Sequence, residues 1–242
     1  NVQDTTNDPT IAQRAPLPFR NYQMSEDYYS AGQLIWLAVD AKIRSLTGDR
    51  KSLDDFARAF FGVDNGSFVT NTYTFEDVVA ALNRVAKYDW ATFLRSRLDA
   101  NRPPMDGIAA SGWKLVYTDK ESDYQKALEK ERKFADFTYS IGLTLSNEGS
   151  AIGDVRWNSP AFKAGISPGA QLVAVNGHAY KSELLKDAIT AAKADRKPIE
   201  LLVKNEDEYK TYAVDYHDGL KYPHLERADG TDYLSRIIAA KR

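Results

Sequence analysis

The stretch Ser25–Gly48, SEDYYSAGQLIWLAVDAKIRSLTG, determines the architecture predicted for the first half of the chain. Its apolar residues recur at the spacing of one helical face and extend round much of the cylinder, so the middle of this helix is predicted to be buried. Ser25 is suited to cap the first turn, and the final glycine is suited to end the helix. The first turn carries Tyr28 and Tyr29, followed by Gly32, where the missing side chain lets another backbone approach closely.

Three shorter helices are predicted to follow this long one. Ser52-Leu53-Asp54-Asp55 and Thr74-Phe75-Glu76-Asp77 each place a capping hydroxyl before acidic first-turn residues. Asp89 is suited to cap a further helix, which a pair of prolines stops. Short connections between amphipathic helices predict an antiparallel helical array. Asn1–Asn21 is polar and interrupted by prolines, so it is predicted to be irregular.

The second half of the chain is predicted to contain mainly short strands instead of helices. Gly112–Tyr117 alternates enough to predict a strand, and the highly charged segment 119–133 predicts a solvated, partly helical linker. Beyond it come short β-rich runs with turn signals and one strong helix, Ser182–Lys193. The strand candidates are Phe137–Leu145, Ile152–Trp157, Gln171–Val175, Ile199–Val203 and Tyr209–Val214. The predicted fold class is therefore multidomain, α followed by α+β, with a small, partly open β-barrel and one main helix in the second part.

Composition excludes several classes of function. The chain has 242 residues, of which 43% are hydrophobic and 27% charged, as in ordinary globular proteins. The formal net charge of −2 gives no electrostatic footprint for nucleic acid or an anionic membrane, and no apolar run is long enough to span a bilayer. The absence of cysteine excludes disulfides, thiolate catalysis and cysteine zinc sites, but it does not decide the compartment. No signal peptide is visible at the start of the sequence.

Three motifs of the second half occur together in order. They are YSIGL at Tyr139–Leu143, SPAFKAGI at Ser159–Ile166 and PGAQLVAVNG at Pro168–Gly177. This combination resembles a PDZ domain, and the resemblance covers roughly Phe134–Tyr216. Ser140 stands where the family's loop has its first glycine, and no histidine begins the following helix.

The resemblance implies a peptide-binding groove. The backbone amides of Ile141, Gly142 and Leu143 would hold a terminal carboxylate, because a turn that contains glycine presents N–H groups to an anion. A peptide would then add as a strand between the segment after Gly142 and the helix that starts near Ser182. The alternative is a PDZ fold that serves as an intramolecular packing module, with its groove empty or covered.

The helical half resembles a different family. YYSAG at Tyr28–Gly32, then Asp40, Arg44 and SLDDF at 52–56, is similar to the glycyl-aminopeptidase type of zinc metallopeptidase. These gluzincin-like enzymes are related to the aminopeptidase N group, and their C-terminal half carries such a helical region followed by a PDZ domain. Supporting pieces are YDW at 88–90, GW at 112–113 and GLKYPHL at 219–225, so the resemblance runs over nearly the whole chain.

This second resemblance assigns a catalytic role to Tyr29. Three residues before Gly32, it occupies the place of a tyrosine whose hydroxyl donates a hydrogen bond to the oxyanion formed at the scissile carbonyl. A phenol suits this task because its hydrogen bond strengthens as negative charge develops. Spacing alone favours another interpretation, in which Tyr28 and Tyr29 are core or rim aromatics of a capped helix.

The residues of the family's zinc site are absent from the sequence. The H-E-x-x-H motif does not occur, and none of His178, His217 and His224 lies four residues from another. No metal site is therefore predicted in this chain, and no cofactor of its own. The resemblance places the zinc site upstream of Asn1, so the chain is expected to be the C-terminal portion of a longer zinc enzyme and inactive alone.

Four segments and one function follow from these expectations. Residues 1–118 are the helical part of the catalytic region, 119–133 the linker, 134–216 the PDZ domain, and 217–242 a tail that packs back. The expected function is that of a zinc-dependent aminopeptidase, whose partners are a peptide substrate and the missing N-terminal part, with neither nucleic acid nor membrane. Relatives are commonly exported, which favours a periplasmic or secreted protein. The rivals are a non-enzymatic peptide-binding PDZ adaptor and a degenerate family member without metal.

Overall fold

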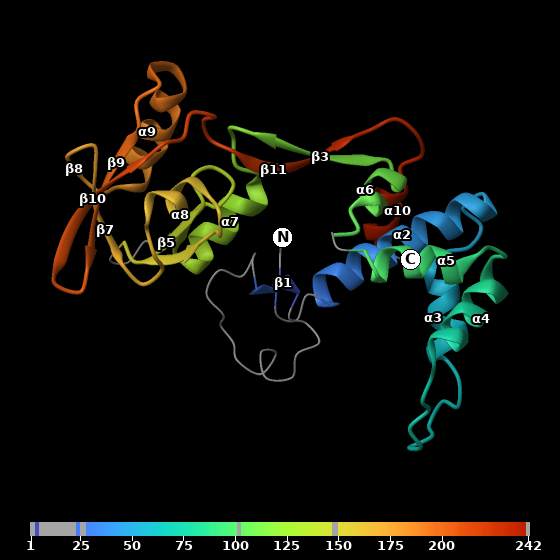
Figure 1. Ribbon diagram of the computed structural model, residues 1–242. Coiled ribbons are helices and arrows are strands. Elements are labelled where there is room, and N and C mark those ends of the chain that lie inside the picture. Colours follow the sequence, from blue (N-terminus) through green and yellow to red (C-terminus); the bar gives the residue numbers. More distant parts are fainter. Residues whose placement is uncertain (1–2, 5–22, 25–27, 101–102, 147–149, 241–242) are drawn as a thin grey trace. The chain divides into compact units, whose positions relative to one another are not determined.

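The computed structural model of the chain describes residues 3–4, 23–24, 28–100, 103–146 and 150–240. The chain divides into two compact units (Figure 1). The helical unit comprises Asp27–Leu115 and Leu225–Arg242, and the mixed unit comprises Asn1–Glu26 and Val116–His224. Each unit has its own apolar core. The protein is a multidomain α and α+β protein, and this prediction is confirmed.

The described part of the helical unit contains the four predicted helices and two short ones that were not predicted. The long helix α2 begins at the first tyrosine of the YYSAG motif, and the predicted cap Ser25 lies outside the described residues. The described helices of this unit are α2 (Tyr28–Thr47), α3 (Leu53–Phe61), α4 (Phe75–Val85), α5 (Trp90–Leu98), α6 (Asp106–Ala110) and α10 (Tyr233–Ile238).

The starts of three helices confirm the capping predictions. Ser52 with Asp55 at α3, and Thr74 with Asp77 at α4, each form a capping box. In each box the hydroxyl accepts a first-turn N–H, while the acid accepts the backbone N–H of the capping residue. Asp89 caps α5, because its carboxylate accepts the N–H of the third residue of the helix at 3.1 Å.

The core of the helical unit is built around a buried tryptophan. Trp90 is fully buried, its Nε1 donates to the Ala86 carbonyl at 2.8 Å, and its ring meets the Phe93 ring edge-on at 5.5 Å between centroids. The donor of the indole is therefore satisfied inside an apolar site. The buried cluster is Ile35, Ala38, Val39, Ile43, Phe56, Ala81, Leu82, Val85, Ala86, Trp90, Phe93 and Leu94.

A two-stranded sheet brings the end of the chain back to its middle. The predicted strand is present as β3 (Trp113–Thr118) and pairs with β11 (Tyr222–Arg227), which was not predicted. Beyond β11, the indole Nε1 of Trp113 donates to the Asp232 carboxylate at 2.8 Å, and α10 contacts α2. Residues 225–240 are thus part of the helical unit.

In its described residues, the mixed unit has two antiparallel sheets, with strand orders β4-β5-β6 and β10-β9-β7-β8. The short strands β1 (Gln3–Asp4) and β2 (Gln23–Met24) pair in parallel. The other strands are β4 (Phe134–Phe137), β5 (Leu143–Ser146), β6 (Ile152–Val155), β7 (Gln171–Val175), β8 (His178–Ala179), β9 (Ile199–Asn205) and β10 (Glu208–Val214). The helices are α7 (Asp123–Arg132), α8 (Pro160–Ala164) and α9 (Ser182–Asp195).

Two predictions for the mixed unit are corrected. The segment Phe137–Leu145 is not one strand, because the chain reverses at Gly142, whose φ is +86°, and returns as β5 alongside β4. Glycine adopts this backbone conformation at little cost. The described strands are not closed into a barrel: they form two sheets, which the isolated antiparallel bridge between Ala151 and Gln171 joins at one point.

One continuous core joins these sheets to the main helix. It includes Leu143 and Leu145 from β5, Leu185 and Ile189 from α9, and Leu201 from β9, all fully buried. The inward residues of β5 and β9 alternate with less buried ones, as expected for strands that bury one face. Burial of this core is the main stabilising contribution of the mixed unit.

The charged segment 119–133 contains the exposed helix α7, which buries none of its described residues. It is nevertheless attached to the mixed unit. The Glu121 carboxylate pairs with the Lys186 ammonium of α9, and the Gln125 side-chain amide donates to the Asp136 carboxylate at 3.2 Å. The prediction of a partly helical segment is confirmed.

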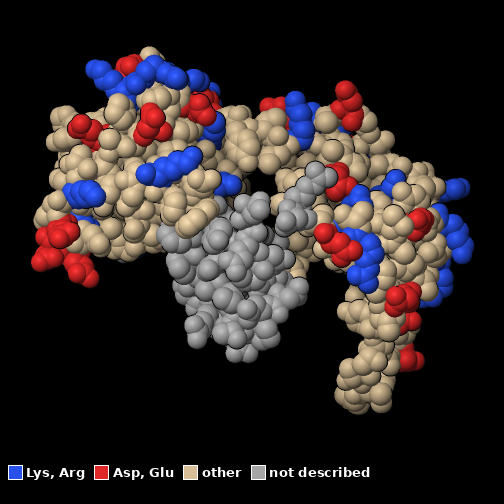
Figure 2. Space-filling model, viewed as in Figure 1, with Lys and Arg blue, Asp and Glu red and all other residues tan. Residues whose placement is uncertain are grey.

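Charge is mixed over the face of the molecule seen in Figure 2, where lysine and arginine side chains lie among aspartate and glutamate. This agrees with a net charge close to zero. No helix in the described part of the chain combines the length and the apolar character needed to cross a membrane.

Candidate functional site

The first turn of α2 is exposed. Tyr28 and Tyr29 begin the helix with 53% and 65% of their surface accessible, and their ring centroids lie 4.6 Å apart. Their aromatic rings therefore lie outside the buried cluster of the helical unit. Spacing alone favoured core or rim aromatics at this helix start, and the exposure of both rings is not that of core residues.

Gly32 was expected to let another backbone approach closely, and no such approach is seen there among the described residues. A side chain built at this position would meet no atom within 4 Å among the described residues. The close approach on α2 occurs further along, at Gly107 of α6. A Cβ there would lie 2.8 Å from the Ala38 backbone nitrogen and 2.9 Å from the Leu34 carbonyl oxygen. Gly107 is thus the glycine that lets a second backbone pack against α2.

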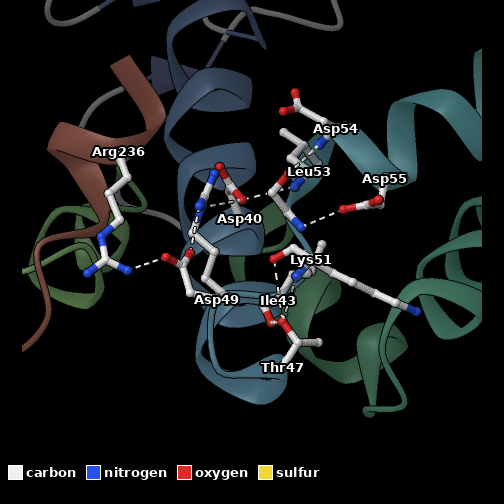
Figure 3. Close-up of polar contacts among 11 residues, drawn as sticks. Asp40, Ile43, Thr47, Asp49, Lys51, Leu53, Asp54, Asp55 and Arg236 are labelled. Carbon is white, nitrogen blue, oxygen red and sulfur yellow. Dashed lines mark hydrogen bonds and ion pairs between the residues drawn. The ribbon is translucent and has the colours of Figure 1, made fainter. Parts of the chain in front are cut away.

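The C-terminal half of α2 is fixed by a buried carboxylate (Figure 3). Asp40 is 5% exposed, and its Oδ1 accepts from Arg44 Nε at 3.1 Å and from the Leu53 backbone N–H at 2.9 Å. Leu53 is the first residue of α3, where backbone N–H groups lack partners within the helix. Asp40 therefore caps α3 from a neighbouring helix, and this contact sets the position of α3 against α2.

Two arginines share a second carboxylate in the same network. Asp49 accepts from Arg44 Nη1 at 2.7 Å and also pairs with the Arg236 guanidinium of α10 (Figure 3). Burial alone would raise the pKa of Asp49, but the hydrogen bonds from the two arginines outweigh it and lower that pKa. Burial likewise opposes the charged form of Arg44, yet the bond to Asp49 and the charge of Asp40 raise its pKa. These shifts favour the charged forms of Asp49 and Arg44, and the network ties α2 to α10.

A surface hollow of about 520 Å³ lies beside α2 in the helical unit. Its polar side chains include Lys42 from α2, Asp89 from the start of α5 and Arg97 from α5, and Tyr88 lies under the Lys42 ammonium at 4.9 Å. Tyr28 and Tyr29 do not line it. The described residues thus bring the two tyrosines together but do not place them in this hollow.

Of the three residues predicted to hold a peptide carboxylate, Ile141 and Gly142 lie in the turn between β4 and β5, and Leu143 is the first residue of β5. Ile141 and Leu143 are fully buried, and the Gly142 N–H donates to the Phe137 carbonyl at 2.9 Å. A Cβ on Gly142 would lie 2.1 Å from the Ser159 Cβ, so the turn packs directly on the start of α8. The Gly142 amide is therefore already bonded within the chain, and Leu143 is paired with residues of both β4 and β6.

Ser140, which replaces the first glycine of the family's loop, has a structural partner. It is 4% exposed, and its hydroxyl accepts the Lys221 backbone N–H at 3.1 Å. This contact fastens the segment before β11 to the β4–β5 turn. A glycine at this position would have no side chain to make the bond.

The histidines are not arranged as a metal site. His217 has Nδ1 at 2.9 Å from the Ala192 carbonyl and Nε2 at 2.7 Å from the Asp215 carboxylate, while His224 Nε2 lies 2.6 Å from the Lys120 carbonyl. Among the described residues, no group of three or more His, Cys, Asp or Glu side chains is placed to hold a metal ion. The described residues do not fit the zinc that the family resemblance implies.

Comparison with solved structures finds a similar fold. The chain is similar to the crystal structure of an aminopeptidase N family protein from Idiomarina loihiensis, with a TM-score of 0.58 and 15% identity. The match covers 88% of this chain and 36% of that chain, so the chain spans about a third of the structure that it resembles. At this identity the likeness shows the fold alone.

A second similarity is weaker. An HtrA3 PDZ domain, solved with a phage-derived ligand, matches 48% of this chain and 93% of its own with 17% identity and a TM-score of 0.24. That value is too low to carry an argument. No protein-family model and no curated protein matches the chain.

The sequence did not predict the contacts that hold α2 in place. Asp40 and Arg44 were noted only as part of the family resemblance, and their contacts with Leu53 and Asp49 were not predicted. The available signal was an acid on the otherwise apolar face of a buried helix, since a buried charge requires a partner. Arg236 gave no such signal because it lies 187 positions from its partner.

Proposed function

We propose that this chain is the C-terminal portion of a zinc-dependent aminopeptidase that removes N-terminal residues from peptides. The observation that carries the proposal is the similarity of 88% of the chain to an aminopeptidase N family fold. The exposed Tyr29 at the start of α2 supports it, because a catalytic hydroxyl must be accessible to substrate. The mixed unit would be an accessory module of the same enzyme.

In this proposal Tyr29 is the catalytic residue contributed by the chain. Its O–H donates to the oxyanion that develops on the scissile carbonyl, and the bond strengthens in the transition state. The N-terminal end of a 20-residue helix favours negative charge as well, because unpaired N–H groups and the helix dipole point there. Asp40 and Gly107 act indirectly, by holding α2 rigidly against α3 and α6.

The remaining parts of the active site belong to other residues of the parent protein. In the family that the chain resembles, zinc activates the attacking water, and the described residues here supply no ligand set for it. We therefore propose that the N-terminal part of the parent provides the metal centre and that the isolated chain is inactive. Release of an N-terminal residue from a chromogenic aminoacyl substrate by the isolated chain with added zinc would contradict this.

The role of Tyr29 is tested in the full-length parent enzyme. Tyr29→Phe should lower kcat/KM by about a hundredfold or more, as expected for the loss of an oxyanion donor. Tyr28→Phe is the matched control, because it removes a hydroxyl from the adjacent exposed ring, and it should change kcat/KM by less than about threefold. Zinc content and thermal stability should be unchanged in both. Full activity of Tyr29→Phe would show that the assigned role is wrong.

A further inference from the structure

The strand β4 occupies one edge of β5. Its four residues run antiparallel to β5, with Phe134 opposite Ser146 and Phe137 opposite Leu143. The other edge of β5 pairs with β6. An extended peptide binds a sheet by adding a strand to a free edge, and both edges of β5 are paired in the described structure.

The end of β4 makes the contacts that an added peptide would need. The Phe137 carbonyl accepts the N–H of Ser140 at 3.1 Å and the N–H of Gly142 at 2.9 Å. Two converging amides in a turn suit a negatively charged oxygen, and here they hold the last carbonyl of the strand. The Phe137 ring is fully buried and Ala135 is 1% exposed, so alternate side chains of β4 fill the core.

The outer edge of β4 is held by α7 rather than by another strand. The Asp136 N–H points away from β5, towards Glu129 Oε1 at 3.4 Å, and the Gln125 amide donates to both Glu129 at 3.0 Å and Asp136 at 3.2 Å. On the same side, Phe134 and Ala135 line a hollow together with the start of α9. β4 therefore pairs with β5 and shares this hollow with the beginning of α9.

We propose that Phe134–Phe137 is an internal ligand that fills the strand-addition position on β5. The ligand class that fits this position is an extended peptide with a carboxy-terminal phenylalanine and a small residue two places earlier, by analogy with Phe137 and Ala135. Such a peptide binds after β4 withdraws, so its apparent affinity is reduced by the fraction of molecules in which β4 is displaced. The inference concerns binding alone and does not depend on the proposed peptidase activity.

The test is a fluorescence-anisotropy titration of the 242-residue chain with a labelled peptide that ends in Lys-Phe-Ala-Asp-Phe and has a free carboxylate. Phe137→Ala removes the buried anchor of β4 and should tighten peptide binding at least tenfold over the unmodified chain. Glu129→Ala loosens β4 from its outer side without touching the apolar core, and it should act in the same direction. Circular dichroism identifies the folded variants, and Glu129→Ala decides the test if Phe137→Ala does not fold.

A disulfide that fixes β4 to β5 should have the opposite effect and weaken peptide binding. Since the Asp136 N–H faces away from β5, Asp136 and Thr144 form a non-hydrogen-bonded pair, the kind in which opposite side chains lie closest. The chain has no cysteine, so Asp136→Cys with Thr144→Cys gives a single crosslink. Oxidation should reduce peptide binding below that of the unmodified chain, and reduction should restore it.

Three outcomes overturn the inference. The first is a peptide that binds the unmodified chain as tightly as the folded loosened variants. The second is binding that is unaffected by the oxidised lock. The third is the absence of binding to a folded loosened variant at millimolar peptide, which would show that the edge beneath β4 does not accept an external strand.

Discussion

Family resemblance assigns a function to two places, the start of α2 and the edge of β5. The first is exposed in the structure, and the second is paired with another strand. Tyr29 stands 65% exposed at the end of a helix whose other half is buried and hydrogen-bonded. The edge of β5 is covered by the chain's own β4. A side chain at a helix start is free to meet a substrate, whereas a strand edge is available only while no other segment pairs with it.

The largest expected effect is a difference in stability between substitutions in buried β5 and at the exposed start of α2. Leu143→Ala removes a fully buried side chain from β5 and should lower the free energy of unfolding by about 2–5 kcal/mol. Tyr29→Ala removes an exposed side chain and should change it by about 0.5 kcal/mol or less. Urea unfolding followed by circular dichroism measures both. A large loss with Tyr29→Ala would mean that the start of α2 is packed and not accessible.

The glycines of the two sites give the next effect. Gly142→Ala combines a positive φ with a Cβ only 2.1 Å from Ser159, and it should cost about 3 kcal/mol. Gly32→Ala is the matched control, because its Cβ meets open space in the described part of a helix. That variant should raise stability by about 0.5–1 kcal/mol. The comparison fails if both substitutions have the same sign.

A smaller effect is expected from the polar network that fixes α2. Asp40→Ala leaves the Leu53 N–H without its partner and removes one of the two carboxylates from Arg44, so it should cost about 1–3 kcal/mol. Asp99→Asn, at an exposed pair with Arg95 3.9 Å apart, is the matched control and should cost about 0.5 kcal/mol or less. Equal losses in chemical denaturation would argue against a special role for Asp40.

Local features of the fold were predictable from the sequence. The capping boxes at Ser52 and Thr74 formed as predicted, because each depends on residues within one turn. The helix α9 and the strand β7 agree closely with the predicted ranges, since their apolar spacing is regular and turn residues bound them. For the candidate site, the sequence placed Tyr28 and Tyr29 in a helical first turn, which the structure confirms.

The surroundings of the two candidate sites depend on tertiary contacts, which the sequence does not display. The segment Phe137–Leu145 looked like one strand, because its apolar pattern continues through a glycine that in fact reverses the chain. The exposure of Tyr29 and the covering of β5 follow from tertiary pairing, which periodicity cannot reveal. The roles of Tyr29, Ile141, Gly142 and Leu143 therefore remain predictions.

The smallest effect concerns the attachment of the chain end, and it appears at acid pH. Asp232 accepts from the Trp113 indole at 2.8 Å and from the Ser235 N–H at 3.0 Å, and these bonds lower its pKa from 3.8 to about 2. A carboxyl whose pKa is lower in the folded state stabilises the fold above the unfolded-state pKa and loses that contribution as pH falls through the folded-state value.

The stability advantage of the unmodified chain over Asp232→Asn should therefore shrink as the pH falls from about 4 to about 2. Trp113→Phe is the matched control, because it keeps an aromatic ring but removes the donor, and the Asp232 pKa measured by NMR should rise towards 3.8. If the advantage over Asp232→Asn is constant across this range, the Trp113–Asp232 bond does not tie the chain end to the helical unit, and the packing of α10 on α2 rests on the Asp49–Arg236 pair instead.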